Sequence, residues 1–176
     1  MSEHPANRRI DKIRDPAFVE GIEGLGLDDV RARRDECLAE REYLSLLRRL
    51  LQGRAEILKA EVEGRASGET DPLVDRLSQI LADDEHPVTS RGEVVRIGVP
   101  EDEMLLARRR VERLVSDAGI SDPATLDDQA LGTAIDALVG EEQGVSEARR
   151  DVIAVLDLLQ DELKRRYKDD PTLSLR

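Results

Sequence analysis

The sequence has very few aromatic residues, two histidines and a single cysteine. Of 176 residues, one is Phe, two are Tyr and none is Trp, which predicts a thin core of Leu, Val and Ala rather than the thick core of a globular enzyme. Because Cys37 is the only cysteine, the chain cannot form an intramolecular disulfide. His4 and His86 lie far apart, and no Cys, His or carboxylate cluster has metal-ligand spacing. We therefore expect no catalytic centre, no bound metal and no cofactor.

Long apolar runs are also missing. None approaches the roughly 18 residues that a membrane-spanning helix needs, and residues 1–14 are polar without the apolar centre of a signal peptide. We expect a soluble cytoplasmic protein without a membrane partner. The formal net charge of −12 disfavours direct nucleic-acid binding, because that binding is driven by Lys and Arg releasing counterions from phosphates. It favours a basic protein partner, such as a DNA-binding protein.

No stretch alternates apolar and polar residues as a strand does, so we predict an all-α fold. Two stretches instead repeat apolar residues at every seventh position, which is the pattern of a coiled-coil seam. The first consists of Val30, Cys37, Leu44, Leu51 and Leu58, with Leu47, Ala55 and Val62 between them. The second consists of Val145, Val152 and Leu159, joined by Ala148, Leu156 and Leu163.

These seams predict two long helices that form an antiparallel coiled-coil hairpin, with shorter connecting helices and flexible termini. Antiparallel packing lets both seams bury each other within one chain, although parallel packing across a long linker also fits. We expect a flexible N-terminal arm over residues 1–26 and a helical hairpin domain over residues 27–176. The domain is expected to contain a long helix over about 27–64, a linker over about 65–100, short helices over about 101–139 and a long helix over about 141–167.

The two seams are related copies of each other. The constant shift that superimposes their apolar positions also superimposes polar residues: Ser45 on Ser146, Arg48 on Arg149, and Glu56 on Asp157. At about 100° per residue, the polar residues of the first copy fall within a sector of roughly 80° on one side of the apolar stripe. The repeat therefore predicts two pseudo-equivalent helices, each with a polar face beside its seam.

Arg48 and Arg149 both lack an acidic residue three or four positions away. Each therefore needs a partner from outside its own helix. One interpretation is a pair of cross-helix bridges, Arg48 to Asp157 and Arg149 to Glu56, worth only about 0 to 1 kcal/mol each if exposed. The other is a ligand, because Arg offers a fork to a guanine edge or a phosphate, Ser and Gln add hydrogen bonds, and a carboxylate accepts from guanine N–H groups. The two interpretations are compatible if the ligand displaces the bridges when it binds.

The first copy resembles the signature E-x3-S-x2-R-x3-Q-x3-D of the actinobacterial RsiG anti-sigma factors, which bind cyclic di-GMP. The matching residues in the run LSLLRRLLQGRAEIL are Ser45, Arg48, Gln52 and Glu56, and those of the second copy are Glu142, Ser146, Arg149 and Asp157. The resemblance extends over most of the chain, including the segment DPAFVEGIEGLGLDDVRARRDE. There are three departures, because Arg41 replaces the Glu of the first copy, Glu56 replaces its Asp, and Ile153 replaces the Gln of the second copy.

The resemblance implies a regulator without enzymatic activity. Similar proteins are antiparallel helical hairpins that hold a dimer of cyclic di-GMP on the two motif copies and, once loaded, clamp a WhiG-type sigma factor to repress sporulation genes. It implies cyclic di-GMP as a regulatory ligand and the sigma factor as the partner. The departures imply that one guanine is held less fully than the other. The competing hypothesis is a coiled-coil scaffold or dimerisation protein with no nucleotide ligand.

Overall fold

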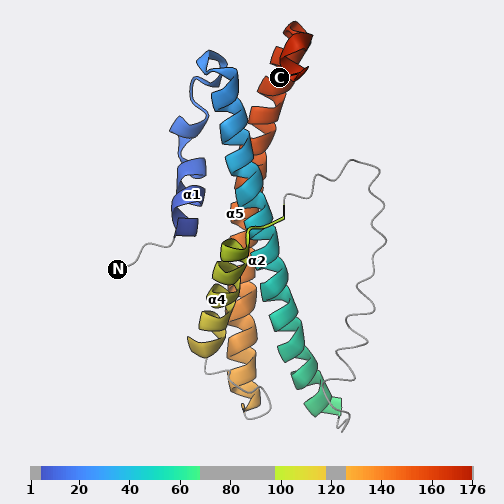
Figure 1. The fold of residues 1–176 in the computed structure, drawn as a ribbon. Coiled ribbons are helices and arrows are strands. Elements are labelled where there is room, and N and C mark those ends of the chain that lie inside the picture. The colour runs from blue at the N-terminus through green and yellow to red at the C-terminus, as the bar shows by residue number, and fades with distance from the viewer. Residues whose placement is uncertain (1–4, 68–97, 118–125, 176) are drawn as a thin grey trace. The chain divides into compact units, whose positions relative to one another are not determined.

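The computed structural model describes residues 5–67, 98–117 and 126–175, and within these ranges it is helical without a strand (Figure 1). The prediction of an all-α fold is confirmed. No helix in these ranges has the length and apolar character needed to cross a membrane. The elements in chain order are α1 (Pro5–Arg14), η1 (Pro16–Phe18), η2 (Ile22–Gly24), α2 (Leu27–Ser67), α4 (Glu101–Asp117), α5 (Asp128–Asp169) and η4 (Pro171–Leu175).

The chain divides into two compact units, each of which contains part of α2 and part of α5. Unit 1 consists of Met1–Leu46 and Gly144–Arg176, and unit 2 consists of Leu47–Gln143. In each unit, early residues of the α2 part pair with late residues of the α5 part, and late residues of the α2 part pair with early residues of the α5 part. Unit 1 has Arg31 with Tyr167 and Ser45 with Arg149, and unit 2 has Arg48 with Glu142 and Arg65 with Asp128. The helices are antiparallel in both units, which confirms the predicted hairpin and excludes the parallel alternative.

The predicted seam residues form the cores of the two units. All five heptad positions of α2, from Val30 to Leu58, are buried, and so are Val145, Val152 and Leu159 of α5. Of the residues predicted to lie between them, only Val62 is half-buried, whereas the others are buried. Leucine, valine and alanine therefore supply most of the apolar burial that stabilises the long helices.

Helix α5 begins earlier than predicted. A separate short helix was expected up to residue 139, but α5 runs without interruption from Asp128 through Gly140 and Gly144. Its start is capped by Asp127, whose Oδ1 accepts from the backbone N–H of Ala130 at 2.7 Å. Leu131 and Leu138 extend the heptad seam of the second copy, and both are buried. Their burial offsets the cost of about 1 kcal/mol for each helical glycine.

Helix α4 belongs to unit 2 and confirms the predicted helix start after Pro100. Glu101, Asp102 and Glu103 occupy its first turn, where negative charge favours the helix dipole. Arg110 of α4 bonds Glu141 of α5, with 2.9 Å between Nε and Oε1. Buried Ala107, Val111 and Val115 form its inner face. Of the predicted linker, residues 65–67 are the end of α2, and residues 68–97 lie outside the described residues.

The segment predicted as a flexible arm over residues 1–26 contains helical structure in the residues that the structure describes. Helix α1 and the turns η1 and η2 cover most of residues 5–24, and the side chains of Ile13 and Phe18 are only 1% and 5% exposed. Arg9 of α1 pairs with buried Glu40 of α2, and Arg14 pairs with Asp151 of α5. Burial of Ile13 and Phe18, together with the two ion pairs, offsets the conformational entropy that the segment loses when it packs.

Candidate functional site

In unit 2, two of the candidate residues converge on the carboxylate of a third. Oε1 of Glu142 accepts from Nε of Arg48 at 2.8 Å and from Nε2 of Gln52 at 3.1 Å. The two donors lie four residues apart on α2 and so on the same face of that helix, whereas the carboxylate comes from α5. The side chain of Arg48 is 41% exposed and that of Glu142 is 19% exposed. This polar group therefore sits at the edge of the seam, open to solvent on the arginine side.

In unit 1, the second arginine is held by a hydroxyl group. Nε of Arg149 donates to Oγ of Ser45 at 2.9 Å, and that hydroxyl donates to the backbone carbonyl of Arg41 at 2.7 Å. Arg41 itself pairs with Glu42, its neighbour in the chain, at 2.8 Å. The prediction that each arginine needs a partner from another helix is confirmed, because Arg48 finds Glu142 and Arg149 finds Ser45.

The two arginines differ in the charge of their partners. The sequence repeat superimposes Glu142 on Arg41, so the position that supplies a carboxylate to Arg48 in unit 2 is a second cation in unit 1. Arg149 is bonded only by the neutral hydroxyl of Ser45 within the part of the chain that the structure describes. The Arg41 departure from the motif therefore leaves the charge of Arg149 less compensated than that of Arg48.

Both arginines keep the ends of their guanidinium groups available. Each makes its hydrogen bond through Nε, and in the described residues neither has a further hydrogen bond from its terminal nitrogens. Bonding through Nε fixes the orientation of the planar group, while the terminal N–H groups remain able to bind a guanine edge or a phosphate. The geometry thus presents two oriented anion-binding groups, one in each unit.

Glu56 and Asp157 do not join these hydrogen bonds in the described residues. Glu56 is exposed and pairs with Lys59 of its own helix at 2.9 Å. Ser146 is half-buried and Asp157 is exposed. The predicted bridges, Arg48 to Asp157 and Arg149 to Glu56, had the wrong partners. They assumed an antiparallel hairpin, but in a different register from the observed one, which brings Glu142 to Arg48 and Ser45 to Arg149.

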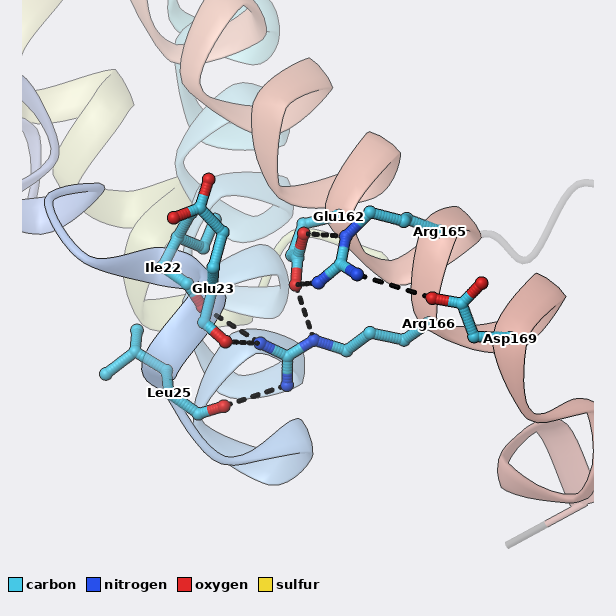
Figure 2. Close-up of polar contacts among 7 residues, drawn as sticks. All are labelled: Ile22, Glu23, Leu25, Glu162, Arg165, Arg166 and Asp169. Atoms are coloured by element: carbon cyan, nitrogen blue, oxygen red, sulfur yellow. Dashed lines mark hydrogen bonds and ion pairs between the residues drawn. The ribbon is translucent and has the colours of Figure 1, made fainter.

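A polar cluster that the sequence did not predict joins α5 to the N-terminal segment of unit 1 (Figure 2). Arg166 donates to three backbone carbonyls of the segment around η2, at 2.9 Å to Ile22, 3.3 Å to Glu23 and 2.8 Å to Leu25. Its Nε also bonds Glu162 one turn earlier at 2.6 Å. We call this cluster of Arg166, Glu162 and the three carbonyls the clasp.

Glu162 is the anionic centre of the clasp. Its side chain is 7% exposed and accepts from both Arg165 and Arg166. The hydrogen bonds from Arg165 and from Arg166 lower the pKa of this carboxyl from 4.5 to about 2, against the opposing effect of burial. The carboxylate is therefore charged at neutral pH and fixes the guanidinium of Arg166 toward the N-terminal carbonyls.

The single thiol belongs to the core. Cys37 is completely buried, and burial, with smaller contributions from Glu36 and Glu40, raises its pKa to about 12. The thiol is thus protonated at neutral pH, as expected for a small apolar core residue rather than a nucleophile. No group of three or more His, Cys, Asp or Glu side chains in the described ranges is arranged to hold a metal ion.

Residues 16–81 match the family model described as RsiG-like. The matched segment includes Ser45, Arg48, Gln52 and Glu56, and it ends before α4 and α5. The match confirms the resemblance found in the sequence over this part of the chain. No curated protein matches the chain.

Proposed function

We propose that this chain, with its RsiG-like segment over residues 16–81, is a cytoplasmic anti-sigma factor that is loaded by cyclic di-GMP. In this proposal it has no catalytic activity and needs no cofactor. When loaded, it sequesters a WhiG-type sigma factor and represses sporulation genes. The observation that carries the proposal is the pair of arginines, Arg48 and Arg149, each oriented through Nε with its terminal nitrogens available.

The ligand chemistry follows from the donor set. Arginine binds the O6 and N7 acceptors of guanine or a phosphate with two parallel hydrogen bonds. Gln52 and Ser45 add neutral donors, and Glu56, Glu142 and Asp157 are carboxylates that can accept from guanine N–H groups. Ser146 occupies the position in the second copy that Ser45 occupies in the first. Two copies of one motif suit a dimer of cyclic di-GMP, which presents the same groups more than once.

The partner chemistry follows from charge. With a formal net charge of −12, the chain offers an acidic surface to a protein that must bind DNA, and complementary charge favours both the rate and the specificity of such association. The cross-helix pair of Arg48 with Glu142 favours the competing hypothesis, a coiled-coil scaffold in which the arginines serve only to join the helices.

Complex formation with a purified WhiG-type sigma factor tests the proposal. Size-exclusion chromatography with light scattering should show a complex in the presence of cyclic di-GMP, and the free proteins without nucleotide or with cyclic di-AMP. A complex that forms equally well without nucleotide would retain the anti-sigma role and refute the ligand dependence. The absence of a complex under all three conditions would contradict the proposed function.

A further inference from the structure

Unit 2 contains a groove between α2 and α4 that is separate from the candidate nucleotide-binding residues. Its volume is about 720 Å³, within the range of sites that bind a ligand or a side-chain cluster. Residues of α2 line one wall and residues of α4 line the other. The apolar lining residues are Leu50 and Ile57 of α2 and Val111 and Val115 of α4.

The groove is basic on an acidic chain. Three of its lining residues are arginines, Arg49, Arg54 and Arg108, whereas one, Glu112, is acidic. The Nε atom of Arg54 is buried and has no hydrogen-bond partner in the described residues. A buried N–H group is stabilised by an acceptor, and the excess of arginine favours a carboxylate as that acceptor. The groove therefore suits an acidic occupant.

The shape of the groove suits a helix. Met104 and Leu105 are exposed apolar residues of α4, 36% and 45% exposed, and they lie one turn before Arg108. The α4 wall of the groove runs from Arg108 to Ser116, about 12 Å at 1.5 Å per residue, and Met104 extends the same helix face by one further turn. Gly53 leaves the α2 wall open, because a Cβ atom there would meet nothing within 4 Å. An amphipathic helix laid along the groove would find contacts at successive turns.

We infer that this groove binds an acidic amphipathic helix of the partner protein, which under the proposed function is the sigma factor. Apolar side chains of that helix pack on Leu50, Ile57, Val111 and Val115, and its flanking carboxylates pair with Arg54 and Arg108. The inference rests on the proposed function for the identity of the partner. It places a contact with the partner at a surface that does not include the candidate nucleotide-binding residues.

Filling the groove from the α2 side tests the inference. Gly53→Leu places a side chain in the open space over α2, and leucine is also a better helix former than glycine. Gly132→Leu on α5 is the matched control, since a Cβ there also meets nothing within 4 Å. We expect Gly53→Leu to weaken the affinity of the cyclic di-GMP-loaded chain for the sigma factor at least tenfold and to leave nucleotide affinity unchanged. Gly132→Leu should change neither.

A charge reversal tests the acidic character of the occupant. Arg108→Glu should weaken sigma binding at least tenfold, whereas Arg109→Glu, at an exposed neighbouring position that does not line the groove, should have little effect. Sigma binding that is equally tight in wild type, Gly53→Leu and Arg108→Glu would overturn the inference and leave the proposed function standing. Failure of the wild-type chain to bind the sigma factor would overturn both.

Two other results would assign the groove to a different occupant and so also overturn the inference. A change in the mass of the chain alone on Gly53→Leu, measured by light scattering, would identify a second copy as the occupant. Increased protease cleavage within residues 68–97 in Gly53→Leu, but not in Gly132→Leu, would identify that segment of the chain itself.

Discussion

Replacing Arg48 and Arg149 together by alanine is expected to abolish cyclic di-GMP binding and to leave the melting temperature nearly unchanged. The side chain of Arg48 is 41% exposed, and exposed ion pairs contribute about 0 to 1 kcal/mol. Each good bidentate contact with guanine, in contrast, contributes about 1 to 3 kcal/mol. Losing two such contacts lowers the affinity by a factor on the order of 100 or more. Calorimetric titration and thermal unfolding of the same variant measure the two effects separately.

The matched control for this prediction is Arg150→Ala. Arg150 adjoins Arg149 on α5 and is exposed, so its removal changes the net charge by the same amount as either single replacement. Nucleotide affinity should remain close to that of the wild type. A large fall in the melting temperature of the double variant would instead show that the arginines serve to join the helices, as the scaffold hypothesis requires.

Arg166→Ala is expected to destabilise the chain by about 2 to 4 kcal/mol, because it removes several partly buried hydrogen bonds at once. The three backbone carbonyls around η2 lose their donor, and Glu162 loses one of its two arginines. Chemical denaturation measures the loss. Limited proteolysis should show faster cleavage within residues 16–26, since the segment is no longer held by α5.

Arg165→Ala provides the comparison within the same cluster. Arg165 also bonds Glu162, but its side chain is 53% exposed, and among the described residues it has no bond to the N-terminal segment. Its removal should cost about 0 to 1 kcal/mol and leave the proteolysis pattern unchanged. Equal effects of the two replacements would contradict the role assigned to the clasp.

The fold was largely predictable because the heptad pattern directly encodes which residues are buried. Leu51 and Leu159, for example, were assigned to the seams from their spacing alone, and both are completely buried. The same principle accounts for the error at Gly140. The predicted boundary near residue 140 separated a short helix from a long one, whereas Leu138 and Val145 on either side of it continue the seam within one helix. Burial of those side chains outweighs the local preference of glycine.

The polar contacts were predictable only in part, because they depend on the register of the helices. Sequence spacing showed that Arg48 and Arg149 lack partners on their own helices, but it did not determine which residues of the opposite helix face them. The clasp was missed for a related reason. Glu162 and Arg166 are four residues apart and resemble an ordinary surface pair of a helix, while the carbonyls that Arg166 binds belong to a segment more than a hundred residues earlier.

Isothermal titration of the wild-type chain with cyclic di-GMP, with cyclic di-AMP as the control for phosphate binding, tests the central claim most directly. The account predicts micromolar or tighter binding, about −8 kcal/mol or better, to the guanine nucleotide alone. Equal binding of both nucleotides would show recognition of phosphate without recognition of guanine. No heat with either nucleotide, with a WhiG-type sigma factor absent or present, would contradict the account and leave a coiled-coil scaffold.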